Sequence, residues 1–383
     1  MKRGVSGFRP ERLIQILDAR GVSQVQLAAL AGVSPGSISK WRSGQQEPTA
    51  DALDKVARAV AVRPEWFLRS MSGFDTGIKL FRSNASALKS ARAYMAVRHD
   101  WSKELAAEFG EIVEYPTANF PSREYRDPNE ISNEDIEVAA AECRQLWKLG
   151  LGPVPDVVLA IENAGGVVVR EATDIARIEG VSSWCSVNDR PFVYLNADRA
   201  NCFRSRFDAA HELGHVVLHR HIPPKVAQAN HKEMERQAHC FAGAFLLPGE
   251  TFSADVPNVP TLDTLLALKL RWKTSAAAML MRLRALELID EQAELNLWKR
   301  RSARFGNKAE PYDDALTPEQ PRLLRRAVAL IVEEGITPRE TIPDRVGLGA
   351  VDVESLSGLP EGYFAPTSGQ VVDLNAVRLR RSQ

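Results

Sequence analysis

The feature that most constrains this chain is the pentapeptide His-Glu-Leu-Gly-His at residues 211–215. Histidines four positions apart lie on the same face of an α-helix, so His211 and His215 can bind one metal ion. Glu212 follows His211 directly, close enough to act on a metal-bound water. Apolar residues flank the motif, as a buried helix requires, and six of the seven histidines fall between residues 211 and 239. The sequence therefore predicts a metal site on a helix, with Glu212 as the general base.

A hydrolytic zinc ion takes three protein ligands and keeps one position open, so a further ligand is needed. His221 stands ten residues after His211, but a turn back toward the metal would need a glycine where this chain has Leu218. Glu235 lies on a later predicted helix, at residues 233–248, and is the rival candidate. Glu233 is the nearest competitor of Glu235 on that helix. From the residues alone, these alternatives remain open.

Two other histidines of the cluster have weaker assignments. His219 continues the motif helix one turn beyond His215 and is expected beside the ligands or at the helix end, since it cannot fold back onto the ion. His239 is expected to orient a ligand, to stabilise an oxyanion or simply to pack. Zinc is the expected metal for imidazole and carboxylate ligands, and manganese is also accepted by such a site.

The residues before the motif mix helices and strands without regular alternation. Apolar spacing predicts a helix around residues 136–147 and a shorter one at 157–163. Runs rich in β-branched and aromatic residues then predict strands, which we place at residues 166–170, 180–187 and 192–196. This order favours an α+β unit over a parallel βαβ array.

The first 70 residues predict four short helices broken by glycine turns. Ser23 and Gln26 have the spacing of a helix-capping box, and Ser34 caps the next helix. Two short helices joined by a tight glycine-containing turn form a helix-turn-helix unit. Residues 1–70 carry 11 basic and 6 acidic side chains, a net charge of 11 − 6 = +5, which suits contact with DNA phosphates. The side chains expected to approach the major groove are Gln24, Ser34, Gly36, Ser37, Ser39, Lys40 and Arg42.

The order of residues 21–60, GVSQVQLAALAGVSPGSISKWRSGQQEPTADALDKVARAV, resembles the helix-turn-helix domain of the Xre/Cro repressor family. The resemblance implies binding to a double-stranded DNA operator. Such domains usually bind paired half-sites as dimers, so a homodimer is expected.

The segments AHELGHVVLH and ERQAHCFAGAFLLP resemble the ImmA/IrrE family of metallopeptidases, over residues 131–248. The resemblance implies a zincin-like fold in which His211, His215 and Glu235 bind zinc and Glu212 is the general base. It further implies an endopeptidase that cleaves a repressor-type protein, itself of the helix-turn-helix class, to control stress or mobile-element genes. The alternative is a metal-binding transcription factor or antitoxin-like repressor that uses the peptidase fold as a sensor or docking module without turnover.

The last third of the chain is less informative. Helices at residues 261–270 and 275–286 form a pair that is either a second helix-turn-helix-like unit or packs on the peptidase. An amphipathic helix is expected at residues 318–334, and the chain ends in an arginine-rich tail. No function is indicated for residues 301–383.

Size and composition agree with a multidomain protein. The chain has 383 residues, 44% hydrophobic, with 49 basic and 49 acidic side chains. Wholesale disorder and a protein that coats nucleic acid along its length are therefore excluded. Scattered cysteines exclude a disulfide framework, and without an apolar run of about 20 residues we expect a soluble, cytoplasmic chain with no membrane contact. The predicted divisions are an all-α helix-turn-helix domain (1–72), a helical linker (73–130), an α+β metallopeptidase domain (131–255), a helical pair (256–300) and a mainly α C-terminal region (301–383).

Overall fold

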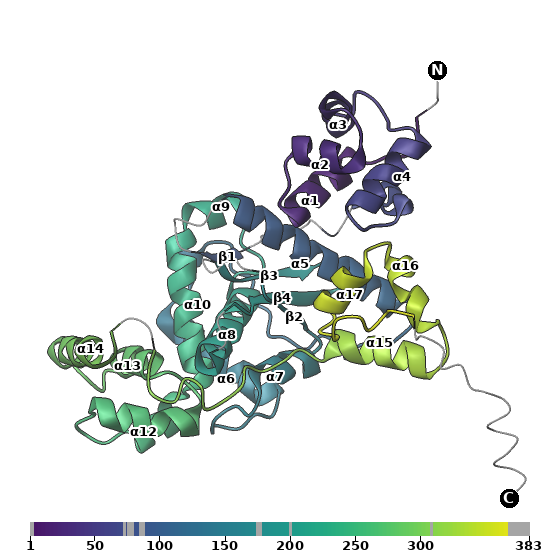
Figure 1. Ribbon diagram of the computed structural model, residues 1–383. Coiled ribbons are helices and arrows are strands. Elements are labelled where there is room, and N and C mark those ends of the chain that lie inside the picture. The colour runs from purple at the N-terminus through teal and green to yellow at the C-terminus, as the bar shows by residue number, and fades with distance from the viewer. Residues whose placement is uncertain are drawn as a thin grey trace, which may run out of the picture.

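The computed structural model describes residues 4–71, 74, 80–83, 89–173, 178–198, 201–306 and 309–366. A helical N-terminal unit, a small mixed sheet with helices on both faces and a helical C-terminal part follow one another along the chain (Figure 1). This is the multidomain α+β layout that the sequence predicts. The basic tail beyond residue 366 lies outside the described residues.

The N-terminal unit is built from short, well-capped helices. Ser23 forms the predicted capping box with Gln26, and the Ser34 hydroxyl accepts a hydrogen bond from the backbone N–H of Ser37. Gly32 ends the second helix in the left-handed conformation, with φ of 62°, which glycine adopts without strain. The elements are α1 (Pro10–Arg20), α2 (Gln24–Ala31), α3 (Pro35–Arg42), α4 (Ala50–Ala59) and the 3₁₀ helix η1 (Pro64–Leu68).

The central sheet has four strands in the order β1-β3-β4-β2. The strands are β1 (Leu80–Ser83), β2 (Val167–Glu171), β3 (Ile178–Cys185) and β4 (Arg190–Asn196). Strand β3 pairs antiparallel with β1 and β4, whereas β2 and β4 are parallel. The sequence predicts β2, β3 and β4, but β1 was not expected.

Successive side chains along a strand point to opposite faces of the sheet, and here both faces are apolar. Phe192 and Tyr194 of β4 pack into one core, and Val193 and Leu195 pack into the other. The period of two follows from strand geometry. One face is therefore covered by the helix that carries the HELGH motif, and the opposite face meets the N- and C-terminal helices.

The helices after the N-terminal unit are α5 (Lys89–Gly110), η2 (Pro128–Glu130), α6 (Asn133–Leu146), α7 (Val157–Asn163), α8 (Cys202–Leu218), α9 (Pro224–Ala229), α10 (His231–Leu246), α11 (Gly249–Asp255), α12 (Leu262–Trp272), α13 (Ala276–Ala285) and α14 (Glu291–Phe305). Among them, α5, α7 and α8 contact the sheet, whereas α12, α13 and α14 lie away from it (Figure 1). None of the helices in the described part of the chain is long and apolar enough to cross a membrane.

Helix α5 joins the N-terminal unit to the sheet. Its buried Trp101 meets Trp66 edge to face, with ring centroids 5.7 Å apart. The Arg12 guanidinium of α1 forms an ion pair with Glu104 at 2.7 Å. Consequently, the core of the helix-turn-helix unit continues through α5 into one face of the sheet.

The C-terminal part packs into the same core. It comprises α15 (Leu323–Glu333), η3 (Arg339–Thr341), α16 (Ile342–Val346) and α17 (Ala350–Leu356). The predicted helix at 318–334 begins later than expected, at Leu323. Two prolines precede this start, at positions 318 and 321, and the Glu162 carboxylate accepts the backbone N–H groups of Arg322 and Leu323.

The predicted helical pair corresponds to α12 and α13, joined by a short turn through Lys273. Helix α13 packs against α10, while Met281 and Arg284 on the same helix are exposed. Its buried Arg282 pairs with Glu137 and donates to the carbonyl of Leu247 at 2.9 Å. These contacts place α13 on the peptidase-like unit.

Candidate metal centre

Helices α8 and α10 lie against each other and carry the site. Gly214, inside the HELGH motif, faces Phe241 and Ala238 of α10. A Cβ atom at position 214 would lie 3.1 Å from the Phe241 Cβ and 3.2 Å from the Ala238 Cα. The missing side chain therefore lets the two helix backbones approach closely.

Three side chains from these helices converge. The Nε2 atoms of His211 and His215 are 3.1 Å apart. The Glu235 carboxylate lies 3.5 Å from His211 Nε2 and 3.3 Å from His215 Nε2. A zinc ion about 2.0–2.1 Å from each of its tetrahedral ligands places them about 3.3 Å apart. The three donors thus already have the spacing that a zinc ion requires.

Burial and charge at these residues agree with a metal site. Both histidines are buried, and Glu235 is largely covered. Burial raises the pKa of Glu235, but the two imidazoles beside the carboxylate outweigh this and hold the pKa below its usual value. The carboxylate is therefore ionised, as a metal ligand must be.

Glu212 lies between α8 and strand β3. Its side chain is fully buried, and its Oε2 accepts a hydrogen bond from the Ser182 hydroxyl at 2.6 Å. A Cβ atom at Gly180 of the same strand would lie 2.7 Å from Glu212 Oε1. Strand β3 therefore leaves room for this carboxylate and holds one of its oxygens.

His219 lies next to the centre without being one of the three converging donors. Its Nδ1 is 2.9 Å from Nδ1 of His215, and its Nε2 is 2.9 Å from Oε1 of Gln237. Burial, reinforced by His215, lowers the pKa of His219 to about 3. It is therefore a neutral imidazole at physiological pH.

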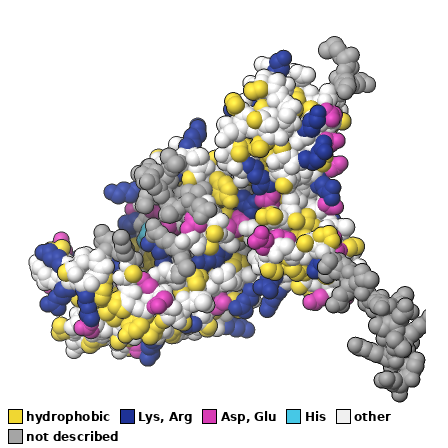
Figure 2. All heavy atoms as spheres, in the orientation of Figure 1, with side chains coloured by type: hydrophobic (Ala, Val, Ile, Leu, Met, Phe, Trp, Pro, Cys, Tyr) yellow, Lys and Arg dark blue, Asp and Glu magenta, His cyan; other side chains and the backbone are white. Residues whose placement is uncertain are grey.

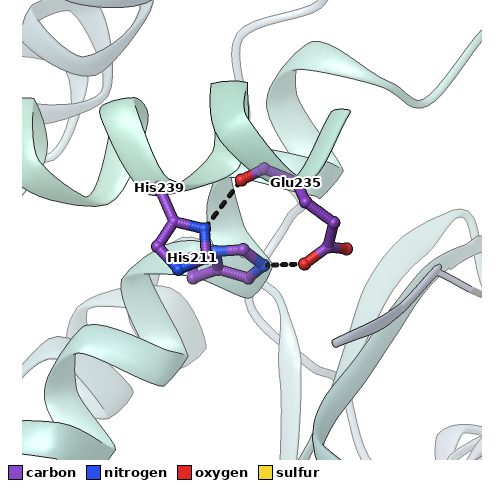
Figure 3. Close-up of side chains that lie close together, drawn as sticks. All are labelled: His211, Glu235 and His239. Atoms are coloured by element: carbon purple, nitrogen blue, oxygen red, sulfur yellow. Dashed lines mark hydrogen bonds and ion pairs between the residues drawn. The ribbon is translucent and has the colours of Figure 1, made fainter. Parts of the chain in front are cut away.

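His239 borders the site from α10 (Figure 3). Its Nδ1 donates to the backbone carbonyl of Glu235 at 2.7 Å, and its ring meets that of His211 edge to face at 4.5 Å. Donor atoms of His211, Glu235 and His239 lie within 4.8 Å of one another. This set is looser than the one with His215, so we regard His239 as a neighbour of the centre.

The rival ligands have other contacts. His221 lies 3.4 Å from the Ser122 hydroxyl and 4.0 Å from Glu124. Glu233 pairs with Arg236 at 2.6 Å, and this hydrogen bond lowers the pKa of Glu233. None of these partners is His211 or His215, so the geometry favours Glu235 as the further ligand.

Sequence reasoning did not find three residues of the site. Ser182 gave no signal because a serine in a strand has no distinctive spacing. Gln237 lies on the predicted ligand helix but carries no charge. His231 was counted among the clustered histidines, but its contact with Glu235 was not predicted. Its Nδ1 lies 3.6 Å from Glu235 Oε1, because residues four apart share one face of a helix.

A cavity of about 560 Å³ opens beside the centre. His239 and Phe207 form the wall nearest the metal ligands, with ring centroids 5.7 Å apart. Ala278 and Met281 of α13 line the apolar side, and Arg301 lines another part. His239 therefore borders the cavity and also contacts the His211 ring.

The predicted DNA contacts lie on the N-terminal unit, away from the sheet (Figure 1). Ile38 and Trp41 of α3 are buried and hold the helix in place. Figure 2 shows Lys and Arg side chains at the outer end and along one flank of this unit. Of the predicted contacts, the exposed ones are Ser34, Gly36, Ser39, Lys40 and Arg42, and the partly buried ones are Gln24 and Ser37.

Comparison with known families identifies both units. Residues 13–67 match the helix-turn-helix family model, and residues 161–284 match the model of the IrrE N-terminal-like domain, a family of metallopeptidases. The chain thus carries an Xre-like helix-turn-helix domain followed by an IrrE N-terminal-like domain, which confirms both resemblances. The first domain indicates DNA-binding regulation, and the second indicates a metallopeptidase-like module, whose family implies a divalent metal. The chain has no match among curated proteins.

Proposed function

We propose that this chain is a DNA-binding transcriptional regulator whose second unit is a zinc-dependent endopeptidase. The convergence of His211, His215 and Glu235 at zinc spacing, with Glu212 buried beside them, is the observation that carries the proposal. The exposed face of α3 would bind an operator, and a homodimer would suit paired half-sites.

The residues of the site divide the work of peptide hydrolysis. When bound, zinc lowers the pKa of a water molecule and polarises the substrate carbonyl. Glu212 accepts the proton from the attacking water and delivers it to the leaving amine. Ser182 holds the other carboxylate oxygen, so that Glu212 keeps one orientation through both transfers.

A protein segment is the substrate that the surroundings favour. The cavity of about 560 Å³ beside His239 has room for side chains next to the bond that is cut. A repressor bound at the same or a neighbouring operator would be brought to this cleft by the helix-turn-helix unit. Cleavage of such a repressor would change transcription of the genes it controls.

Glu212→Gln tests the catalytic part of the proposal, because glutamine can still accept the Ser182 hydrogen bond but cannot take up a proton. We expect the zinc-loaded wild type to cleave members of a proteome-derived peptide mixture, read by mass spectrometry. The variant should keep its zinc and lose at least about 100-fold in rate. Equal cleavage by both proteins would contradict the role of Glu212.

The alternative is a regulator in which the metal centre is a sensor or docking module without turnover. The continuous core between the DNA-binding unit and the sheet favours this reading, since the two units are packed together. If Glu212→Gln regulates a reporter gene as well as the wild type does, but Glu235→Ala does not, the sensor alternative replaces proteolysis.

A further inference from the structure

The side-chain amide of Gln237 has a single orientation that its surroundings allow. Its Nε2 lies 2.7 Å from the carbonyl of Pro128, 3.4 Å from that of Ile131 and 3.1 Å from the Glu233 carboxylate. All three partners only accept hydrogen bonds, so the NH₂ end must face them. The amide oxygen of Gln237 consequently faces His219.

This orientation determines where the protons of His219 lie. An amide oxygen only accepts, so His219 must donate from Nε2, 2.9 Å away. A second proton on this ring would make a fully buried cation with no carboxylate hydrogen-bonded to it, which is costly. The Nδ1 atom of His219 is therefore an acceptor, and it faces Nδ1 of His215 at 2.9 Å.

We propose that Gln237 and His219 are positioning residues that hold His215 in its Nδ1–H tautomer. In that tautomer, Nε2 of His215 carries a lone pair, and this is the atom that lies 3.1 Å from His211 Nε2 and 3.3 Å from Glu235. The inference rests on the proposed metal centre. It adds that the ligand is preset before any metal arrives.

The preset tautomer has an energetic consequence. A free imidazole in water favours the Nε2–H tautomer, in which the ligating nitrogen is blocked by a proton. Without the hydrogen bonds that link Gln237, His219 and His215, metal binding would also have to move that proton, which would weaken the affinity. Loss of such a supporting hydrogen bond typically weakens metal affinity by about 10- to 100-fold.

The test begins with the full-length, metal-free wild type, labelled with ¹⁵N at histidine. The proposal predicts that His215 shows a protonated Nδ1 and an unprotonated Nε2, and that His219 shows a protonated Nε2. The signals of His215 are assigned by their loss in His215→Asn. A protonated Nε2 on His215, or a fast mixture of both tautomers, would overturn the proposal.

Variants then separate positioning from mere packing. Gln237→Met removes the acceptor at similar volume, and His219→Phe removes the ring nitrogens. Both should release the His215 tautomer and lower zinc affinity by about 10- to 100-fold. His219→Gln should rescue affinity, since its amide oxygen can accept from His215 while its NH₂ donates to Gln237. If all three variants bind zinc as tightly as the wild type, the proposal is contradicted. If a variant does not fold, the ¹⁵N spectrum of the wild type still tests the tautomer of His215.

The outcome also separates this inference from the proposed function. A wild type with the predicted tautomer that binds no zinc would refute the metallopeptidase while leaving the hydrogen-bond chain intact. A wild type that binds zinc tightly but shows Nε2–H on His215 before loading would refute only the positioning role.

Discussion

At the residue scale, the placement of Glu212 depends on a glycine in the strand across from it. In Gly180→Ala, the added Cβ would lie 2.7 Å from Glu212 Oε1, so the carboxylate must move. We expect peptide hydrolysis to fall by roughly 10- to 100-fold, since a displacement of about 1 Å has effects of this size. Zinc content should stay at the wild-type level. Gly152→Ala is the control, because nothing lies within 4 Å of its Cβ position, and equal activity of both variants would contradict the role of Gly180.

Glu162 makes a second prediction at this scale, for the pH dependence of stability. Burial raises its pKa to about 7, although backbone N–H groups of Leu323 and Arg322 oppose the shift. The folded chain therefore holds a proton that the unfolded chain releases near pH 4.5, and stability falls as pH rises from about 4.5 to 7. The loss amounts to at most roughly 3 kcal/mol.

Glu162→Gln should remove this contribution. In urea unfolding, the wild type should lose stability relative to the variant between pH 4.5 and 7.5, and other titrating groups cancel in that difference. A difference that is constant with pH would show that Glu162 titrates normally.

At the element scale, the site depends on how closely α8 and α10 approach. Gly214→Ala places a methyl group 3.1 Å from the Phe241 Cβ and 3.2 Å from the Ala238 Cα. The helices must separate, which moves Glu235 away from the histidines. Overpacking of this kind costs about 1–3 kcal/mol, and we expect zinc affinity to fall at least about tenfold.

Gly243→Ala is the matched control on α10. Its nearest contact would be Arg282 at 3.7 Å, so the alanine should stabilise the helix by up to about 1 kcal/mol without changing zinc affinity. Thermal unfolding and zinc titration of both variants measure the contrast. Unchanged affinity in Gly214→Ala would mean that the helix spacing does not set the ligand geometry.

Local sequence patterns predicted many of the helices and strands, including the helix that carries the HELGH motif. Four-residue spacing places His211 and His215 on one face, and capping residues such as Ser23 mark helix starts. Spacing could not bring Glu235 to that face, because the distance between two helices depends on tertiary contacts such as that at Gly214. The assignment of Glu235 therefore needed the family resemblance. Ser182 and Gln237 become visible as partners only when β3 and α10 are packed.

At the scale of the whole molecule, a buried ion network links the DNA-binding unit to the sheet. Asp352 of α17 accepts from Arg20 of α1 at 2.6 Å and from Arg98 of α5. Arg98 also pairs with Glu171 at the end of β2, whose carboxylate accepts the Tyr194 hydroxyl at 2.7 Å. Helix α17 of the C-terminal part thus connects the DNA-binding unit to the sheet through these ion pairs.

Asp352→Ala should therefore destabilise the whole chain. It leaves the buried Arg98 with one partner fewer, and breaking a buried pair in this way typically costs about 3–5 kcal/mol. Asp344→Ala is the control, because its pair with Arg63 is exposed and should contribute less than about 1 kcal/mol. Equal losses in urea unfolding would contradict the fastening role of Asp352.

The packing of the C-terminal helices between the DNA-binding unit and the sheet could not be predicted from the sequence. Residues 301–383 carried no recognisable motif, and the partners of Asp352 are more than 250 positions away along the chain. The linker at residues 73–130 was predicted to be helical, but the sequence did not indicate which core its helix α5 enters. Long-range packing of this kind leaves little local trace, because any buried surface of similar shape would satisfy the same apolar residues.

The central claim is that His211, His215 and Glu235 form a metal centre, and metal content per chain tests it most directly. Elemental analysis of the zinc-supplied wild type, after excess metal is removed, should give about one zinc per chain. Glu235→Ala should retain far less, whereas Glu233→Ala should match the wild type. A well-folded wild type without metal, or a Glu235→Ala variant that holds zinc as firmly as the wild type, would contradict the account.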